Sequence, residues 1–253
     1  MARESKKRAI PWRLIFGIIL AALLSAAVGM AAVRVRRFAL DDPQFTFSRD
    51  HKNALAVEGI RYASRAKVFR VFAPDFEHSI FSVPLAGRRR ELLAIDWVED
   101  ASVSRIWPDR LVVRIRERKP VAFVSLRIGV LLIDGHGVLL DPPVQAQFAF
   151  PVLSGIRESD SLVGRRERVR TFLRVEDDMG YLMKDISEVD VSDPDSIRVV
   201  AQVGNHALEL LVGDSDFGRR YQNFLSHYSE IEKHSPEVRV FDLRLEDRIT
   251  AKE

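Results

Sequence analysis

The feature that most restricts the fold of this chain is an apolar run near its N-terminus. Residues 14–33, LIFGIILAALLSAAVGMAAV, are twenty consecutive residues without a charge. An α-helix rises about 1.5 Å per residue, so this run makes a helix about 30 Å long, which matches the hydrocarbon core of a bilayer. We therefore predict one transmembrane helix at residues 14–33, preceded by a short tail at residues 1–13.

A cleaved signal peptide is the alternative to a retained anchor. Residues 29–32, GMAA, supply small residues that a peptidase could accept. The apolar core is longer than the usual 7 to 15 or so residues of a signal peptide, which favours the anchor. Basic residues flank the run on both sides, so the positive-inside rule leaves its orientation open. Ala21, Ser25 and Gly29 form a small-residue face that either packs on another membrane helix or simply contacts lipid.

Composition and motifs argue against an enzyme. The chain has 253 residues, 47% hydrophobic and 30% charged, which is typical of a folded protein. A net charge of +3 does not indicate nucleic acid as a partner. The absence of Cys excludes thiol catalysis, thiolate zinc sites and disulfides, and the six His residues lack metal-ligand spacing. No nucleophile elbow, phosphate loop or dinucleotide motif is present, so we predict no catalytic, cofactor or metal site.

After the apolar run, the sequence predicts a small domain of strands and helices. Ser64 is the expected N-cap of the first short helix, and Pro74 ends it. We expect, in order, a charged linker, a strand, a helix, an extended segment and a second helix, at residues 34–53, 54–60, 65–73, 79–85 and 86–98.

Residues 99–124, EDASVSRIWPDRLVVRIRERKPVAFV, predict a hairpin that turns at WPDR. Leu111, Val113 and Ile115 alternate with Arg114 and Arg116, so the strand has one apolar face and one charged face. We interpret the charged face first as a solvated sheet surface, with a specific anion site as the alternative.

This stretch resembles the POTRA domain of the bacterial cell-division FtsQ/DivIB family. That family has the run WV..A.V.R.WP..L.V.V.ER.PVA, and the chain fills it with fourteen residues: Trp97, Val98, Ala101, Val103, Arg105, Trp107, Pro108, Leu111, Val113, Glu117, Arg118, Pro120, Val121 and Ala122. A match with two Trp and two Pro in register is specific.

The second half predicts a β-rich domain. Residues 129–142 are two apolar runs around Asp134-Gly135-His136-Gly137, a hairpin turn that the resemblance also implies; a metal or acid–base role for Asp134 and His136 is the weaker alternative. Strands are expected at 151–156, 187–193, 196–203, 206–213, 238–245 and 248–252, helices at 166–183 and 216–234, and a turn at Glu246-Asp247.

The predicted fold class is α+β: a single N-terminal transmembrane helix, a β-α-α-β-β POTRA-like domain at residues 54–121, and a mostly antiparallel β-rich domain at 122–253 with helices on one face. The resemblance implies a cytoplasmic tail at 1–13, a periplasmic location for both domains and enrichment at the division septum. It implies a non-enzymatic bitopic scaffold of the divisome that recruits FtsB/FtsL-like single-span proteins through the β-rich domain. It also implies that the POTRA-like domain and the anchor contact other divisome components.

The last predicted strand is an edge to which a partner strand can add. Arg248, Thr250 and Lys252 share one face of it and Ile249 and Ala251 the other, so charge can steer an acidic partner. The resemblance implies a partner surface on this last hairpin and the neighbouring helix. The candidate partner-binding residues are therefore Arg244, Leu245, Arg248, Ile249, Thr250, Ala251 and Lys252, with Arg220 on that helix and Arg198 on an adjacent strand as weaker candidates.

Three alternatives remain open. The first is that the edge strand only ends the sheet. The second is an exported POTRA-bearing chaperone or secretion component that handles polypeptides by β-augmentation, and the third is an envelope enzyme with an unrecognised site.

Overall fold

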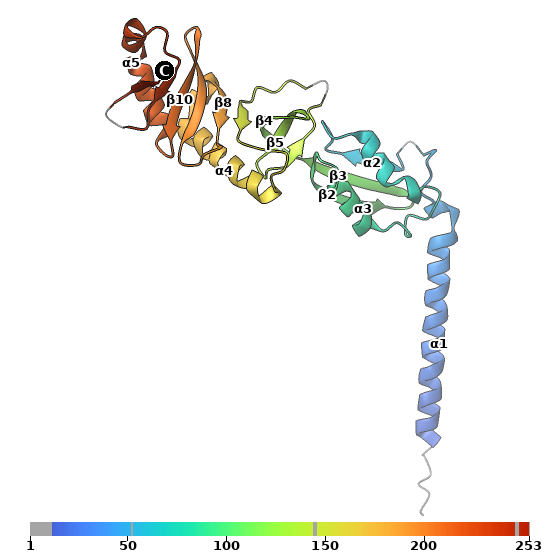
Figure 1. The fold of residues 1–253 in the computed structure, drawn as a ribbon. Helices are drawn as coiled ribbons and strands as arrows, with labels where there is room; N and C mark the ends of the chain where they lie inside the picture. The colour runs from blue at the N-terminus through green and yellow to red at the C-terminus, as the bar shows by residue number, and fades with distance from the viewer. Residues whose placement is uncertain (1–11, 52, 144–145, 246–247, 253) are drawn as a thin grey trace, which may run out of the picture. The chain divides into compact units, whose positions relative to one another are not determined.

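A computed structural model gives the fold and describes residues 12–51, 53–143, 146–245 and 248–252. The chain forms two compact units, shown in Figure 1. The first contains the described residues up to Ile60, with Ser64–Ile95 and Asp100–Arg116; the second contains Arg61–Ala63, Asp96–Glu99 and the residues from Glu117 onward. Residues 1–11 of the expected tail and the expected turn at Glu246-Asp247 lie outside the described residues.

The N-terminal helix α1 is longer than the apolar run. It spans Trp12–Asp41, and in the part of the chain that the structure describes it is the one helix long and apolar enough to cross a membrane. The first eight residues of the expected linker, 34–41, continue this helix. The charged residues in this stretch give the helix a polar surface but do not prevent it from forming. Pro43 is the first residue after the apolar run that stops a helix. Phe45 and Phe47, farther along the expected linker, are buried.

The first unit has the predicted β-α-α-β-β order. Its elements are β1 (Leu55–Glu58), α2 (Arg65–Val71), α3 (Leu85–Leu93), β2 (Val98–Ile106) and β3 (Arg110–Glu117), with short 3-10 turns at Pro43–Phe45 and Ala73–Asp75. The sheet order is β1-β3-β2, and β1 runs parallel to β3. Leu111, Val113 and Ile115 are buried while Arg114 and Arg116 are exposed, which confirms the alternation predicted for this strand.

The extended segment expected at residues 79–85 does not become a sheet strand. Its only strand-like contact among the described residues is an isolated bridge between Ser79 and Thr46. The Ser79 hydroxyl donates to the carbonyl of Ala39, and the Ser82 hydroxyl donates to the carbonyl of Ser79. These side-chain bonds to the backbone hold a turn where the apolar pattern alone predicts a strand.

The second unit is a nine-stranded mixed sheet with two long helices. The strands are β4 (Pro120–Leu126), β5 (Gly129–Asp134), β6 (Leu139–Leu140), β7 (Val152–Ser154), β8 (Ile186–Asp190), β9 (Ile197–Val203), β10 (His206–Gly213), β11 (Val240–Asp242) and β12 (Thr250–Lys252). The helices are α4 (Leu162–Met179), followed by a 3-10 segment at Gly180–Asp185, and α5 (Phe217–His234). The strand order is β12-β11-β10-β9-β8-β7-β4-β5-β6.

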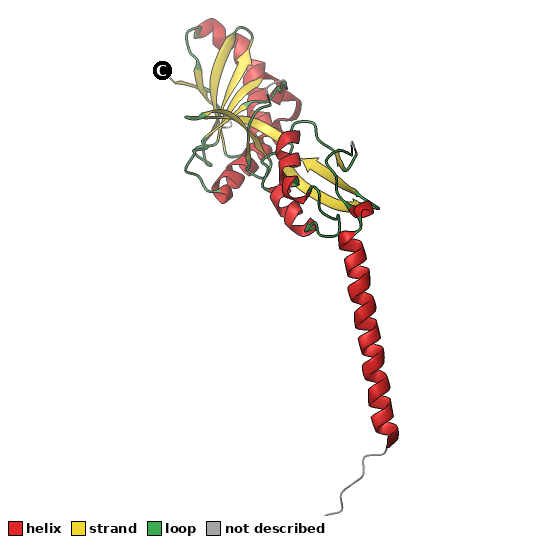
Figure 2. Cartoon of the chain, turned by 90° about the vertical axis from the view of Figure 1, so that its right-hand side faces the viewer, coloured by secondary structure: helices red, strands yellow, loops and turns green. Residues whose placement is uncertain are grey.

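The topology explains why both helices cover one face of this sheet. Helix α4 connects β7 to its parallel neighbour β8, and α5 connects β10 to its parallel neighbour β11. Strands β7 and β10 run in the same direction, and each connection leads to the neighbouring strand on the β12 side of the sheet. Because such crossovers are right-handed, both helices lie on the same face. The helices pack closely: a Cβ on Gly218 of α5 would lie 2.6 Å from the carbonyl oxygen of Asp178 in α4. Figure 2 shows the sheet and its helices from a second direction.

Candidate docking edge

The last strand of the chain lies at the edge of the large sheet. β12 is first in the strand order and pairs with β11, with Thr250 opposite Asp242, Ala251 opposite Phe241 and Lys252 opposite Val240. All three β12 residues are exposed. The outer side of β12 therefore offers main-chain N–H and C=O groups to another strand.

This edge hairpin is shorter than the sequence predicts, with strands at Val240–Asp242 and Thr250–Lys252 instead of 238–245 and 248–252. The Asp242 side chain ends β11, because its Oδ1 accepts a hydrogen bond from the backbone N–H of Arg244, two residues on, at 3.1 Å. Such an Asx turn redirects the chain out of the extended conformation. Arg248 and Ile249, which the sequence predicts as part of the last strand, precede β12 and lie outside it.

Asp242 also organises the charges on the open face of this edge, the face opposite α4 and α5. The Arg244 guanidinium donates two hydrogen bonds to its carboxylate, at 2.8 and 2.6 Å, and Lys252 Nζ lies 3.7 Å from it. The hydrogen bonds from Arg244 lower the pKa of Asp242 to about 2, although partial burial opposes this shift. Two of the predicted partner-binding cations are thus already paired within the protein.

Arg198 lies on the same face as this charge cluster, but two strands farther in. It stands opposite Leu211, which stands opposite Asp242, so the three side chains point to the same side of the sheet. Arg198 forms ion pairs with Asp190 at 3.1 Å and with Glu209 at 3.3 Å. The structure therefore brings Arg198 to the predicted face without placing it on the edge itself.

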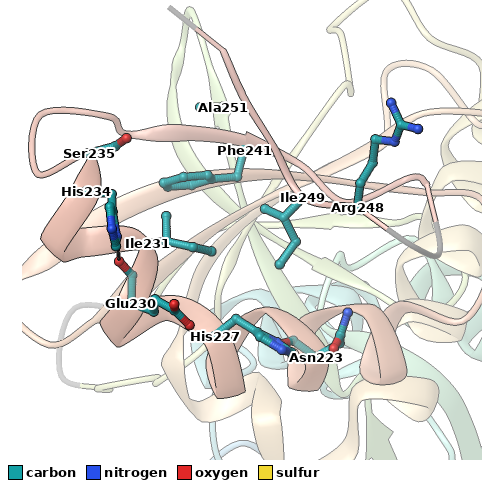
Figure 3. Close-up of a pocket in the computed structure, with 10 residues that line it drawn as sticks. All are labelled: Asn223, His227, Glu230, Ile231, His234, Ser235, Phe241, Arg248, Ile249 and Ala251. Atoms are coloured by element: carbon teal, nitrogen blue, oxygen red, sulfur yellow. Dashed lines mark hydrogen bonds between the residues drawn. The ribbon is translucent and has the colours of Figure 1, made fainter.

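On the opposite face, a groove separates α5 from the last segment of the chain. It has a volume of about 610 Å³. Figure 3 shows Ile249 pointing from the chain's end toward α5, with Phe241 and Ile231 forming an apolar wall and His227 and Glu230 on the helix. The complete set of lining residues is Asn223, His227, Glu230, Ile231, His234, Ser235, Phe241, Arg248, Ile249 and Ala251.

Arg220 has a different position from the one its place on a polar helix face predicts. Its Nη1 donates to the carbonyl of Val212 at 2.6 Å, and its Nε is buried with no hydrogen-bond partner among the described residues. Arg220 also lines a second cavity of about 290 Å³, together with the exposed Leu245 and with Ile249. Arg220 therefore connects the start of α5 to the end of β10, and it forms part of the wall of this second cavity.

Sequence reasoning missed the residues that shape the edge from within, namely Asp242, Phe241 and the α5 residues of the groove. One signal was available: an Asp two residues before an Arg at the end of a strand favours the Asx turn seen here. The groove had no such signal, because its existence depends on the distance between α5 and residues 248–251, which no local sequence pattern encodes.

The turn at Asp134 uses its carboxylate for structure. Oδ1 accepts hydrogen bonds from the backbone N–H groups of His136 and Val138, and Oδ2 accepts one from Arg118. The predicted hairpin is present, with β5 antiparallel to β6. Over the described ranges, no group of three or more acidic or His side chains is arranged to hold a metal ion.

Comparison with known proteins links this architecture to one family. Residues 53–118 match the family model described as "POTRA domain, FtsQ-type". The chain is 32% identical to the cell division protein FtsQ of Koribacter versatilis, over 90% of this chain and 67% of that protein. It is 24% identical to FtsQ of Syntrophotalea carbinolica, over 98% and 90% of the two chains, and 25% identical to FtsQ of Alcanivorax borkumensis, over 97% and 87%.

Fold and site define a class of protein: an apolar N-terminal helix consistent with a single-pass membrane anchor, a POTRA-type unit, and a β-rich unit that ends in an exposed edge strand. The relatives make the assignment specific. The chain belongs to the FtsQ family of cell-division proteins, which are non-enzymatic divisome components, and its membership implies partners within the division machinery.

Proposed function

We propose that this protein is a bitopic scaffold that recruits and links FtsB/FtsL-like single-span division proteins at the septum by strand addition to β12. In this proposal residues 1–13 are cytoplasmic, residues 14–33 cross the inner membrane, and the POTRA-like domain (54–121) and β domain (122–253) are periplasmic. The POTRA-like domain and the anchor contact other divisome components. The alternative of an exported chaperone or secretion component has lost its support, because the relatives are cell-division proteins.

The observation that carries the proposal is the combination of an open edge and a groove beside it. A partner strand that pairs with β12 gains main-chain hydrogen bonds, which supply affinity. Its side chains alternate between the two faces of the extended sheet. Those on the α5 side would enter the groove between Ile231 and Ile249, where apolar side chains are favoured.

The charge pattern assigns a second role to the opposite face. Arg244 and Lys252 are held by Asp242, so a partner's carboxylate must compete with an existing ion pair. Arg248 also lines the groove, and Figure 3 shows its side chain pointing away from α5, where an acidic partner can approach it directly. We therefore assign specificity to the groove and to Arg248, and assign to the Asp242 cluster the task of fixing the shape of β12.

Proline substitution at the edge tests this mechanism. In an antiparallel pair, successive residues direct their N–H groups alternately toward and away from the partner strand. Of Thr250→Pro and Ala251→Pro, one therefore removes a donor from the outer edge and the other a donor to β11. We expect the outer-edge variant to fold normally and to bind a peptide from the membrane-proximal periplasmic region of the FtsB-like partner at least about tenfold more weakly.

Thr250→Ala and Ala251→Ser are the matched controls, because they change the side chain and keep the N–H. They should bind the peptide nearly as well as the parent protein. Equal affinity for the parent and for both proline variants, in proteins shown to be folded by circular dichroism, would refute strand addition at β12.

A further inference from the structure

A cluster of aromatic rings joins the end of α1 to the rest of the first unit. Phe45 contacts Phe38 at 5.6 Å, Phe81 at 5.1 Å and Trp107 at 5.8 Å between ring centroids, each edge to face. Phe81 also contacts Trp107 at 5.2 Å. The rings come from α1, from the turn after it, from the segment before α3 and from the β2–β3 turn, so the cluster gathers four separate parts of the chain.

Only the centre of this cluster is buried. Phe45 is 5% exposed, whereas Phe38 is 54% and Trp107 66% exposed. Ile106, next to Trp107 in the chain, and Val35, about one helical turn before Phe38 on α1, are also exposed. An exposed patch of large apolar side chains marks a contact surface when its members are contiguous, and Phe38 and Trp107 are joined through the ring of Phe45, which both contact.

The position of the cluster along α1 indicates what covers it. Phe38 is five residues beyond Val33, the last residue of the apolar run, on the same unbroken helix. Five residues correspond to about 7.5 Å of helix, and the polar layer on each side of the hydrocarbon core is roughly 5 to 8 Å thick. If the apolar run spans the hydrocarbon core, Phe38 therefore lies at the level of the lipid headgroups.

The chemistry around the cluster suits that level. Trp is enriched at membrane interfaces, because its ring is apolar and its N–H can reach water or a headgroup. Arg34, Arg36 and Arg37 are exposed on the same helical segment, where guanidinium groups can pair with lipid phosphates. The bond from the Ser79 hydroxyl to the Ala39 carbonyl, at 2.7 Å, ties the first unit to this part of α1.

We propose that Phe38 and Trp107 form a second membrane contact, in which the β2–β3 turn of the POTRA-like unit rests in the headgroup layer of the bilayer. This contact would hold the unit against the membrane instead of letting it swing on the helix. It rests on the proposed role of α1 as a membrane anchor.

Tryptophan fluorescence in lipid vesicles tests the contact. The chain contains Trp12, Trp97 and Trp107, and Trp97 is only 6% exposed. The full-length protein with Trp12→Phe is reconstituted into phosphatidylcholine vesicles with or without bromine on the acyl chains near the headgroup. Bromine should quench emission by up to about half, because one of the two remaining indoles lies at the interface. The matched protein with Trp12→Phe and Trp107→Phe should show little quenching.

Flotation of the same vesicles separates failure of this inference from failure of the anchor. Protein that floats with the vesicles but is not quenched overturns the contact and leaves the anchor in place. Protein that does not float overturns both. A Trp107 blue shift that requires a high protein-to-lipid ratio and is insensitive to bromine identifies a second copy of the chain as the occupant, which also overturns the lipid contact.

A second measurement leaves Trp107 unchanged. Because the chain has no Cys, Ile106→Cys carries a spin label at a single site beside the cluster. We expect the label to be more accessible to oxygen dissolved in lipid than to a water-soluble nickel chelate. The reverse order of accessibilities would contradict the contact.

Discussion

Replacement of Glu117 probes the loop that joins β1 to α2. The Glu117 Oε1 accepts hydrogen bonds from the backbone N–H groups of Arg61 at 2.9 Å, Tyr62 at 2.8 Å and Ala63 at 2.6 Å. A single carboxylate oxygen thus satisfies three consecutive donors that a turn leaves without strand or helix partners. This gives a physical reason for the Glu in the ER.PVA part of the sequence.

The expected cost follows from the burial of these donors. The bond to Arg61 is exposed, so water can replace it at little cost, whereas Tyr62 and Ala63 are half-buried or buried. A buried donor left without a partner costs about 1 to 3 kcal/mol, so Glu117→Ala should lower the free energy of unfolding by about 3 kcal/mol. Glu117→Gln keeps an acceptor oxygen but loses its charge, and should cost about 1 kcal/mol.

Trp97 is a local reporter for this experiment, because its ring packs on Tyr62 with the centroids 5.1 Å apart. In the full-length protein with Trp12 and Trp107 replaced by Phe, urea unfolding in detergent micelles is followed by Trp97 emission. Glu167→Gln is the matched control, since its ion pair with Arg170 is exposed and is worth at most about 1 kcal/mol. A Glu117→Ala protein as stable as this control would refute the reasoning.

Three further predictions concern the β domain. The Tyr221 hydroxyl is buried without a hydrogen-bond partner among the described residues, and burial raises its pKa to about 12, so Tyr221→Phe should raise the free energy of unfolding by about 1 kcal/mol in a urea titration. The lowered pKa of Asp242 stabilises the fold above about pH 4, and about 2 kcal/mol should be lost as the pH falls toward 2. Amide protection of β11, corrected for intrinsic exchange, should show this loss, and Asp242→Asn should remove this part of the pH dependence. Gly213 has φ +82, a conformation that L residues rarely adopt, and a Cβ there would also displace the Arg220 guanidinium, so Gly213→Ala should cost about 1 to 3 kcal/mol in thermal or urea unfolding; unchanged stability would contradict the backbone strain.

Local chemistry made much of the fold predictable. Ser64 caps α2 as expected, because its hydroxyl accepts from the N–H of Lys67. The helix predicted at 166–183 begins four residues earlier, at Leu162, because Ser161 caps it through the N–H of Gly164, and its last predicted residues belong to the 3-10 segment Gly180–Asp185. The apolar stripe of α5 is present: Phe217, Tyr221, Phe224 and Tyr228 are buried, with Leu225 and Ile231 partly buried beside them.

Long-range pairing set the limit of prediction. The parallel contact of β1 with β3 and the order of the nine strands depend on segments that are far apart in the sequence, and no local pattern encodes them. At the candidate site, alternation placed Ile249 and Ala251 on one face of the last strand, and in the structure both line the groove. It could not show that Lys252 also lies beside Asp242, because that contact forms only when β11 and β12 come together, whereas the Asp242–Arg244 pair is local.

Amide hydrogen exchange tests the central claim, strand addition at β12, most directly. Full-length protein in detergent is compared with and without the membrane-proximal periplasmic peptide of the FtsB-like partner. We predict that exchange slows in residues 250–252 on binding, while the opposite edge of the sheet, β6 (Leu139–Leu140), exchanges as before. Protection that appears at β6 or on α5 and leaves β12 unchanged would contradict the account.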